Sequence, residues 1–316
     1  MKASGKIAAS VVGLIAVFLA ALGAGRIVGP LGGDDRPVAA AGGDHAAGGD
    51  HADTGDHADT GDAGAGHVGA GAAVGPPAGL QISQDGYRLQ PLTGSLRPGG
   101  TIEFAFRVHG PDGAPVTRYI PTHERDLHLI IVRRDLTGFQ HVHPVLGPDG
   151  VWRTPLTVAT AGQYRVFADF RPAGRAEALA LGTDVPAAGD YVPAALPAVS
   201  RVARVGRYTV ELAGDLTPGS ASRLVLRVSR DGRPVTDLQP YLGAYGHLVT
   251  LRAGDLAYLH THPDGAPGDG RTPAGPDVVL YADVPSPGTY RLYLDFRHDG
   301  VVRTAEFTAV TAGVHR

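Results

Sequence analysis

Short segments in which apolar and polar residues alternate recur along residues 101–296, and turn sequences separate them. The turns carry Asp-Gly pairs, as in residues 111–113, 147–150 and 230–232. Neither half of this region keeps a helical apolar period. Short alternating strands between such turns predict an all-β sandwich. The predicted strands are residues 101–108, 127–133, 151–158 and 163–170 in one half, and residues 222–228, 247–252, 278–284 and 289–296 in the other.

The second half is a copy of the first. Residues 112–117 recur as residues 231–236, with Asp, Gly, Pro, Val and Thr in the same places. Residues 162–170 recur as residues 288–296 at a larger offset, because the second copy has extra residues in a Gly/Pro-rich stretch. An insertion in a surface loop between matching segments indicates two homologous domains. We assign these β-sandwich domains to residues 80–197 and 198–316.

A membrane signal precedes the domains. Lys2 and Lys6 are followed by an apolar run over residues 7–25, and Arg26 closes it. At about 1.5 Å per residue, this run nearly spans a hydrocarbon core of about 30 Å. We predict a transmembrane helix within residues 1–28 that contacts the membrane through residues 7–25. The positive-inside rule then predicts a single-pass cell-membrane protein with extracellular C-terminal domains. A cleaved signal peptide, which makes the protein secreted, and a buried soluble helix are the alternatives.

Residues 29–79 are predicted to be a disordered linker rich in His, Asp and Gly, because they contain too few large apolar residues to form a core. Histidines follow Gly-Asp at regular spacing and recur once more out of phase; they are His45, His51, His57 and His67. Imidazole next to carboxylate on a flexible segment binds divalent metal ions weakly. The alternative is an acidic spacer without a ligand.

The composition narrows the chemistry. The chain has no cysteine, and its one methionine is Met1, so disulfides and soft Cys or Met metal sites are excluded. Any bound metal is therefore held by histidine, carboxylate, backbone or water. The net charge of −3 and the absence of a basic stripe make nucleic acid an unexpected partner. No nucleophile elbow or phosphate-binding glycine loop is present, so we expect no enzyme activity.

One pattern, His-x12-His-x-His-Pro, occurs once in each domain. Two histidines separated by one residue on an extended segment project to the same side, and a hairpin returns them beside the first histidine. The sequence therefore predicts a site of three imidazoles at one end of each sandwich, for Cu(II) or Zn(II). A hydrogen-bonded structural cluster is the alternative. The predicted metal ligands are His128, His141 and His143 in the first domain and His247, His260 and His262 in the second.

The alternation also predicts which way these strands face. If Arg133 and Arg252 point to solvent, then Leu129 and Ile131 are on the outer face, and His128 points into the sandwich core with Ile130 and Val132. The same reasoning turns His247 inward with Val249 and Leu251. The histidines without a counterpart in the other repeat are expected at the surface; they are His109, His123, His298 and His315.

Two further pairs of residues recur. Tyr164 and Tyr290 follow Gly-x at the start of a strand, as in the tyrosine corner of immunoglobulin-like Greek keys, and a structural role is expected for both. Asp169 and Asp295 lie on the opposite strand face. They are expected either to orient an imidazole or to pair with the arginines at 165 and 291 on that face.

Residues 128–132, 139–144 and 162–170 together resemble exported actinobacterial proteins with paired immunoglobulin-like domains. They are similar, more distantly, to extracytoplasmic β-sandwiches of the YtkA-like and CopC-like kind. The resemblance implies two tandem immunoglobulin-like Greek-key β-sandwiches and a link to copper handling. We therefore predict an envelope protein that binds a divalent metal for storage, delivery or sensing, with a metal-transport or envelope protein as its partner. The alternative is a non-catalytic structural or protein-interaction module whose histidines are packing residues.

Overall fold

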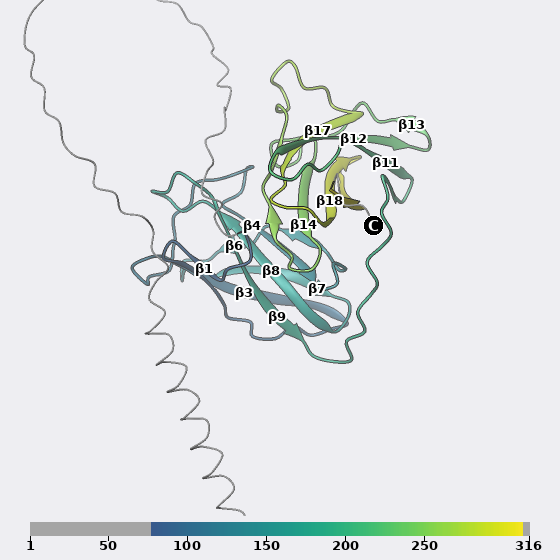
Figure 1. Ribbon diagram of the computed structural model, residues 1–316. Coiled ribbons are helices and arrows are strands. Elements are labelled where there is room, and N and C mark those ends of the chain that lie inside the picture. The colour runs from purple at the N-terminus through teal and green to yellow at the C-terminus, as the bar shows by residue number, and fades with distance from the viewer. Residues whose placement is uncertain (1–76, 312–316) are drawn as a thin grey trace, which may run out of the picture. The chain divides into compact units, whose positions relative to one another are not determined.

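The computed structural model describes residues 77–311, and this part of the chain is all-β (Figure 1). Among these residues, none belongs to a helix that could cross a membrane. The predicted transmembrane segment at 7–25 and the linker histidines at 45, 51, 57 and 67 lie outside the described residues, as does His315.

The first sandwich consists of two antiparallel sheets, and the chain crosses between them after every two or three strands. One sheet has the order β1-β2-β3-β7-β6 and the other β5-β4-β8-β9. This is the arrangement of an immunoglobulin-like sandwich, in which two antiparallel sheets face each other and the chain passes from one to the other more than once. Its strands are β1 (Ser83–Gln84), β2 (Tyr87–Pro91), β3 (Gly100–His109), β4 (Leu127–Arg133), β5 (Gln140–Val142), β6 (Val145–Leu146), β7 (Trp152–Val158), β8 (Gly162–Phe170) and β9 (Leu179–Ala187).

The second sandwich repeats this plan. Its sheets have the orders β10-β11-β12-β17-β16, with β13 paired to β12, and β15-β14-β18-β19. The two tandem sandwiches confirm the predicted fold class for the described residues. The strands are β10 (Val202–Val205), β11 (Tyr208–Ala213), β12 (Ala221–Arg230), β13 (Arg233–Pro234), β14 (His247–Arg252), β15 (Tyr258–Leu259), β16 (Thr261–Pro263), β17 (Asp277–Asp283), β18 (Thr289–His298) and β19 (Val301–Val310).

Each sandwich has its own apolar core and its own tyrosine corner. In the first, Tyr164 packs in the core, and its hydroxyl donates to the carbonyl oxygen of Thr160 at 2.9 Å. In the second, Tyr290 donates in the same way to Ser286 at 2.7 Å. Each hydroxyl therefore ties the preceding loop to its sheet, as predicted.

The predicted facing of β4 is wrong. Leu129 and Ile131 pack in the core of the first sandwich, while Ile130 and Val132 lie on the other face of the sheet, against the second sandwich. His128 shares that outer face. The prediction failed because Arg133 is buried in an ion pair with Asp135 at 2.6 Å and does not mark the solvent side.

The same correction applies to β14. Leu248 belongs to the core of the second sandwich, whereas Val249 and Leu251 face the first sandwich. His247 lies on this outer face as well, since side chains alternate along a strand. Both faces of β4 and β14 are covered by protein, so exposure does not alternate along these strands.

The two sandwiches meet through the outer faces of β4 and β8 in the first and β14 and β18 in the second. We call this contact the seam. Its apolar residues are Ile130, Val132, Leu136 and Phe167 from the first sandwich and Val249, Leu251, Leu256 and Tyr293 from the second. Phe139 stacks on Tyr293 with ring centroids 4.0 Å apart, and Tyr258 packs on Phe167 at 5.6 Å. Phe139 and Tyr258 occupy the same position in the two repeats, and so do Phe167 and Tyr293. The two contacts are therefore related by exchange of the repeats, which gives the seam an approximate two-fold symmetry.

Candidate metal centre

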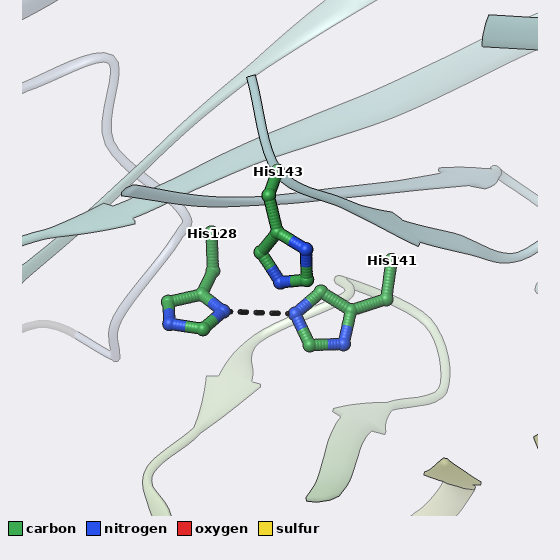
Figure 2. Close-up of side chains that lie close together, drawn as sticks. All are labelled: His128, His141 and His143. Atoms are coloured by element: carbon green, nitrogen blue, oxygen red, sulfur yellow. Dashed lines mark hydrogen bonds between the residues drawn. The ribbon is translucent and has the colours of Figure 1, made fainter. Parts of the chain in front are cut away.

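Three histidines of the first repeat converge on the seam. His128 lies on β4, His141 on the partner strand β5, and His143 follows directly after β5. The hairpin pairs Ile130 with His141, which places His143 beside His128 on the same face. One nitrogen from each ring lies within 4.8 Å of the others, and Figure 2 shows the rings turned toward one another. The three histidines come together as their spacing predicts, but on the outer face of the sheet rather than inside the sandwich; we call the three residues the triad.

The hydrogen bonds of the triad fix which nitrogens carry lone pairs. A carbonyl oxygen only accepts, so Nε2–H of His128 donates to Thr122 at 2.9 Å and Nδ1 is left with a lone pair. A carboxylate likewise only accepts, so Nδ1–H of His141 donates to Asp295 at 2.9 Å, and in the neutral ring Nε2 has the lone pair. These two lone-pair nitrogens are 3.0 Å apart (Figure 2). Only a cation between them, either a proton or a metal ion, makes that contact favourable.

This spacing matches a metal site. Two imidazole nitrogens at about 2.0–2.1 Å from one tetrahedral ion are separated by about 3.3 Å. The third member, His143, has a buried Nε2 without a hydrogen-bond partner among the described residues. An unpaired nitrogen in a buried position is costly, and a metal ion satisfies it.

The electrostatics favour neutral, ligating imidazoles. Burial lowers the pKa of His128 to about 4, and the neighbouring His141 contributes in the same direction. Burial and the same neighbour lower the pKa of His143 to about 3. Both rings are therefore unprotonated at neutral pH, as a metal ligand must be.

A carboxylate of the other sandwich orients the triad. Asp295 on β18 is buried, and besides His141 it accepts the hydroxyl of Thr304 at 2.6 Å. Of the two predicted roles for this aspartate, the structure shows the orienting one, because Arg291 bonds instead to Glu306. An imidazole held by a carboxylate behind it is the usual arrangement at metal sites.

The equivalent aspartate of the first repeat has a different partner. Asp169 accepts the hydroxyl of Tyr258 across the seam at 3.2 Å. Arg165 pairs with Asp184, so the predicted Asp169 ion pair with this arginine is not formed.

The three histidines predicted for the second repeat do not converge. His262 is exposed and stacks on Tyr281 with ring centroids 5.2 Å apart, while His247 lies on the seam. The reason is where the chain changes sheets. In the first repeat this happens after His143, whereas in the second β15 pairs with β14 but β16 already pairs with β17. His260 occupies the crossing point and is exposed.

Instead, His247 joins the cluster of the first repeat. Its ring centroid is 5.7 Å from that of His128 and 5.8 Å from that of His141. Burial lowers its pKa well below the usual value, and its Nε2 is buried without a hydrogen-bond partner among the described residues.

Two of the histidines expected at the surface make specific contacts, although His123 is exposed as predicted. The ring of His123 lies 4.6 Å from that of His247, at the edge of the cluster. His298 is buried between the Tyr208 hydroxyl at 2.7 Å and Asp237 at 3.0 Å. Neither has a counterpart in the other repeat, so the duplication, which identified the triad, provided no signal for them.

These features define a class of protein, a tandem pair of immunoglobulin-like domains whose facing sheets enclose a histidine cluster. The chain belongs to the family described as Domain of unknown function (DUF8832), whose model matches residues 82–187 and again residues 203–313. The two matches confirm the duplication. No curated protein matches the sequence.

Several solved structures are similar at a low level. FdeC, an Escherichia coli adhesin, is 16% identical over 73% of this chain and 65% of its own, with a TM-score of 0.24. Invasin, a bacterial integrin-binding protein, is 16% identical over 71% of this chain and 39% of its own, with a TM-score of 0.20. A putative membrane anchored protein from Corynebacterium diphtheriae is 12% identical over 73% of this chain and 59% of its own, with a TM-score of 0.22. Likenesses at this level carry no argument about activity or partners.

Proposed function

We propose that the protein is a non-catalytic module of the cell envelope that binds a divalent transition-metal ion, Cu(II) or Zn(II), at His128, His141 and His143. The observation that carries the proposal is the 3.0 Å contact between two imidazole nitrogens whose other nitrogens are already committed as donors. A ligand set of nitrogen donors suits both ions, and the intrinsic order of affinity favours copper.

The surroundings support the same conclusion. The buried, unpartnered Nε2 of His143 supplies a third nitrogen, and Asp295 holds His141 in the orientation that a metal requires. Storage, delivery and sensing are the roles proposed for the bound ion. The envelope location is proposed from Lys2, Lys6 and the apolar run at 7–25, which imply a membrane-tethered protein or, after cleavage, a secreted one.

The linker histidines are proposed as a second, weaker place for metal. His45, His51 and His57 each follow aspartate on a segment of low apolar content. Such a segment loses conformational freedom when it wraps an ion, so its affinity is expected to be lower than that of the prearranged triad.

A second candidate function is a protein-interaction module in which the histidines only pack. The bond between His141 and Asp295 joins the two sandwiches, and it needs no metal, because the Nδ1–H group of an imidazole donates directly to a carboxylate. In that case the cluster fixes the relative placement of the two domains, and the protein binds its partner through another surface.

Metal titration of matched variants separates the two candidates. The background is the full chain with His45, His51, His57 and His67 replaced by alanine, which removes the linker ligands without truncating the protein. We expect His143→Ala to lose one equivalent of Zn(II) or Cu(II) in calorimetry. His262→Ala, the same motif position in the second repeat, is the control and should retain that equivalent because its ring is exposed and outside the triad.

The packing alternative predicts a different result. The background protein then binds neither ion, and His143→Ala lowers the melting temperature without changing any response to metal.

A further inference from the structure

A small cavity lies next to the triad, on the side of the second repeat. Its volume is about 80 Å³, enough for a few water molecules. It opens between the two sandwiches, and both contribute to its wall. Its polar lining is Thr122, His123, His128, His141, Asp169, His247, Tyr258, His260 and Thr261. Five imidazoles and a carboxylate surround this small space, and packing of the two domains alone does not require such a concentration of polar groups.

The approximate two-fold relation of the seam accounts for this lining. It exchanges His128 with His247, His141 with His260, and Asp295 with Asp169. The first repeat supplies His128 and His141 with Asp295 behind them; the related set is therefore His247 and His260 with Asp169. All three members of the related set line the cavity.

The third histidine of the related set is replaced. His262, the counterpart of His143, is stacked on Tyr281 in the other sheet. His123 lies in its place, with its ring 4.6 Å from that of His247. Two reciprocal backbone hydrogen bonds between Thr122 and Arg125, at 2.9 and 3.1 Å, hold the turn that carries it.

The polar groups that line the cavity are suited to bind a cation. Nε2 of His247 is buried and has no hydrogen-bond partner among the described residues. Asp169 provides the one carboxylate of the lining, and the exposed His260 can turn toward the cavity without repacking the core.

We infer that this cavity is a second cation position, in which His123, His247 and His260 provide imidazole nitrogens and Asp169 a carboxylate to a divalent transition-metal ion. The inference rests on the proposed function, since it takes the seam to be a metal-binding surface. It adds a ligand set drawn from both repeats and a second ion beside that of the triad.

Stoichiometry and magnetic coupling test the inference. In the full chain with the four linker histidines replaced by alanine, Cu(II) titration should give two equivalents at the seam. Because the rings of His128 and His247 are 5.7 Å apart, two bound Cu(II) ions lie close enough for dipolar broadening of the electron paramagnetic resonance signal. The spectrum should therefore be narrow at one equivalent and broadened at two.

Variants assign the equivalents. His123→Ala should reduce the stoichiometry from two to one and abolish the broadening, while His143→Ala removes the other equivalent. His123→Asn should have the same effect, and asparagine tolerates the positive φ of 49° at this position, so folding is preserved. His262→Ala is the control and should retain both equivalents and the broadening.

The possible failures are distinct. If the background protein binds one ion, which His143→Ala removes, the second position is wrong and the proposed function stands. If His262→Ala rather than His123→Ala removes the second ion, the ligand set is wrong. If no ion binds, both the inference and the proposed function fail.

Discussion

His128, His141 and Asp295 form a hydrogen-bonded row that crosses from one sandwich to the other. Each outer nitrogen of the two rings donates to a fixed oxygen, and the two inner nitrogens are turned toward each other at 3.0 Å. The orientation of each ring is set by the group behind it rather than by its neighbour. This arrangement of the two rings supports the proposed cation site.

The depressed pKa values of the buried histidines predict a pH dependence of stability for the metal-free protein. The pKa of His128 is about 4 and that of His143 about 3, against 6.5 for an unperturbed histidine. The unfolded chain therefore binds more protons than the folded one between these values. The full stability is present above pH 6.5 and is lost as the pH falls through the folded values, with roughly 3 kcal/mol from His128 alone.

Urea unfolding in the presence of a chelator, from pH 7.5 to pH 4, measures this loss. His143→Leu removes one of these titrating groups, so its stability should decline less steeply over the same range. Equal slopes for the variant and the parent protein would show that His143 is not held neutral by the fold.

At the scale of elements, the tyrosine corners stabilise each sandwich separately. The hydroxyls of Tyr164 and Tyr290 donate to loop carbonyl oxygens four residues earlier in the chain. Tyr164→Phe and Tyr290→Phe should each lower the free energy of unfolding by about 1 kcal/mol, because the hydrogen bond that ties the loop to the sheet is lost.

Denaturant unfolding of both variants provides the measurement. Tyr191→Phe is the control, because this tyrosine is exposed and its ring packs against the side chain of Arg133. No change at either corner, or an equal loss in the control, would refute a specific role for the two hydroxyls.

The strands that lie inside the sheets, with a neighbouring strand on each side, were predictable from the sequence. Every predicted strand is present, and β4 and β14 have the predicted bounds. The edge strand β9 was missed because glycine and proline interrupt its alternation, as at Gly182 and Pro186. The face of β4 was predicted wrongly because all seven of its residues are buried. Buried and exposed positions therefore do not alternate along this strand, and the sequence gives no sign of which face packs in the sandwich core.

The candidate site was predictable only in part. The spacing of His128, His141 and His143 on a hairpin was sufficient to predict their convergence. His262 does not join His247 because the second repeat changes sheets before His262. The matching residues of the two repeats give no sign of this difference. The pairing of His141 with Asp295 depends on how the two domains dock. The apolar pattern of one strand does not show whether a buried face packs in its own domain or against the other domain.

At the scale of the whole described region, the seam makes the two sandwiches interdependent. Ile130 and Tyr293 are fully buried there, and the Tyr293 hydroxyl donates to Leu136 of the other sandwich at 2.7 Å. We predict that the two sandwiches unfold in one cooperative transition. Ile130→Asp should separate it into two, because an unpaired charge cannot remain buried in the seam.

Differential scanning calorimetry distinguishes one transition from two. Val145→Asp is the control, since Val145 is exposed and the same substitution there should leave a single transition. Two transitions in the parent protein would mean that the seam contributes little to stability.

The most direct test of the metal site is anomalous diffraction at the zinc edge from crystals of the protein grown with Zn(II). If the proposed site is right, an anomalous peak is expected between Nδ1 of His128, Nε2 of His141 and the ring of His143, with His141 still bonded to Asp295. Crystals that contain zinc elsewhere but show no peak among these three rings, with the His128 to His141 contact unchanged, would contradict it.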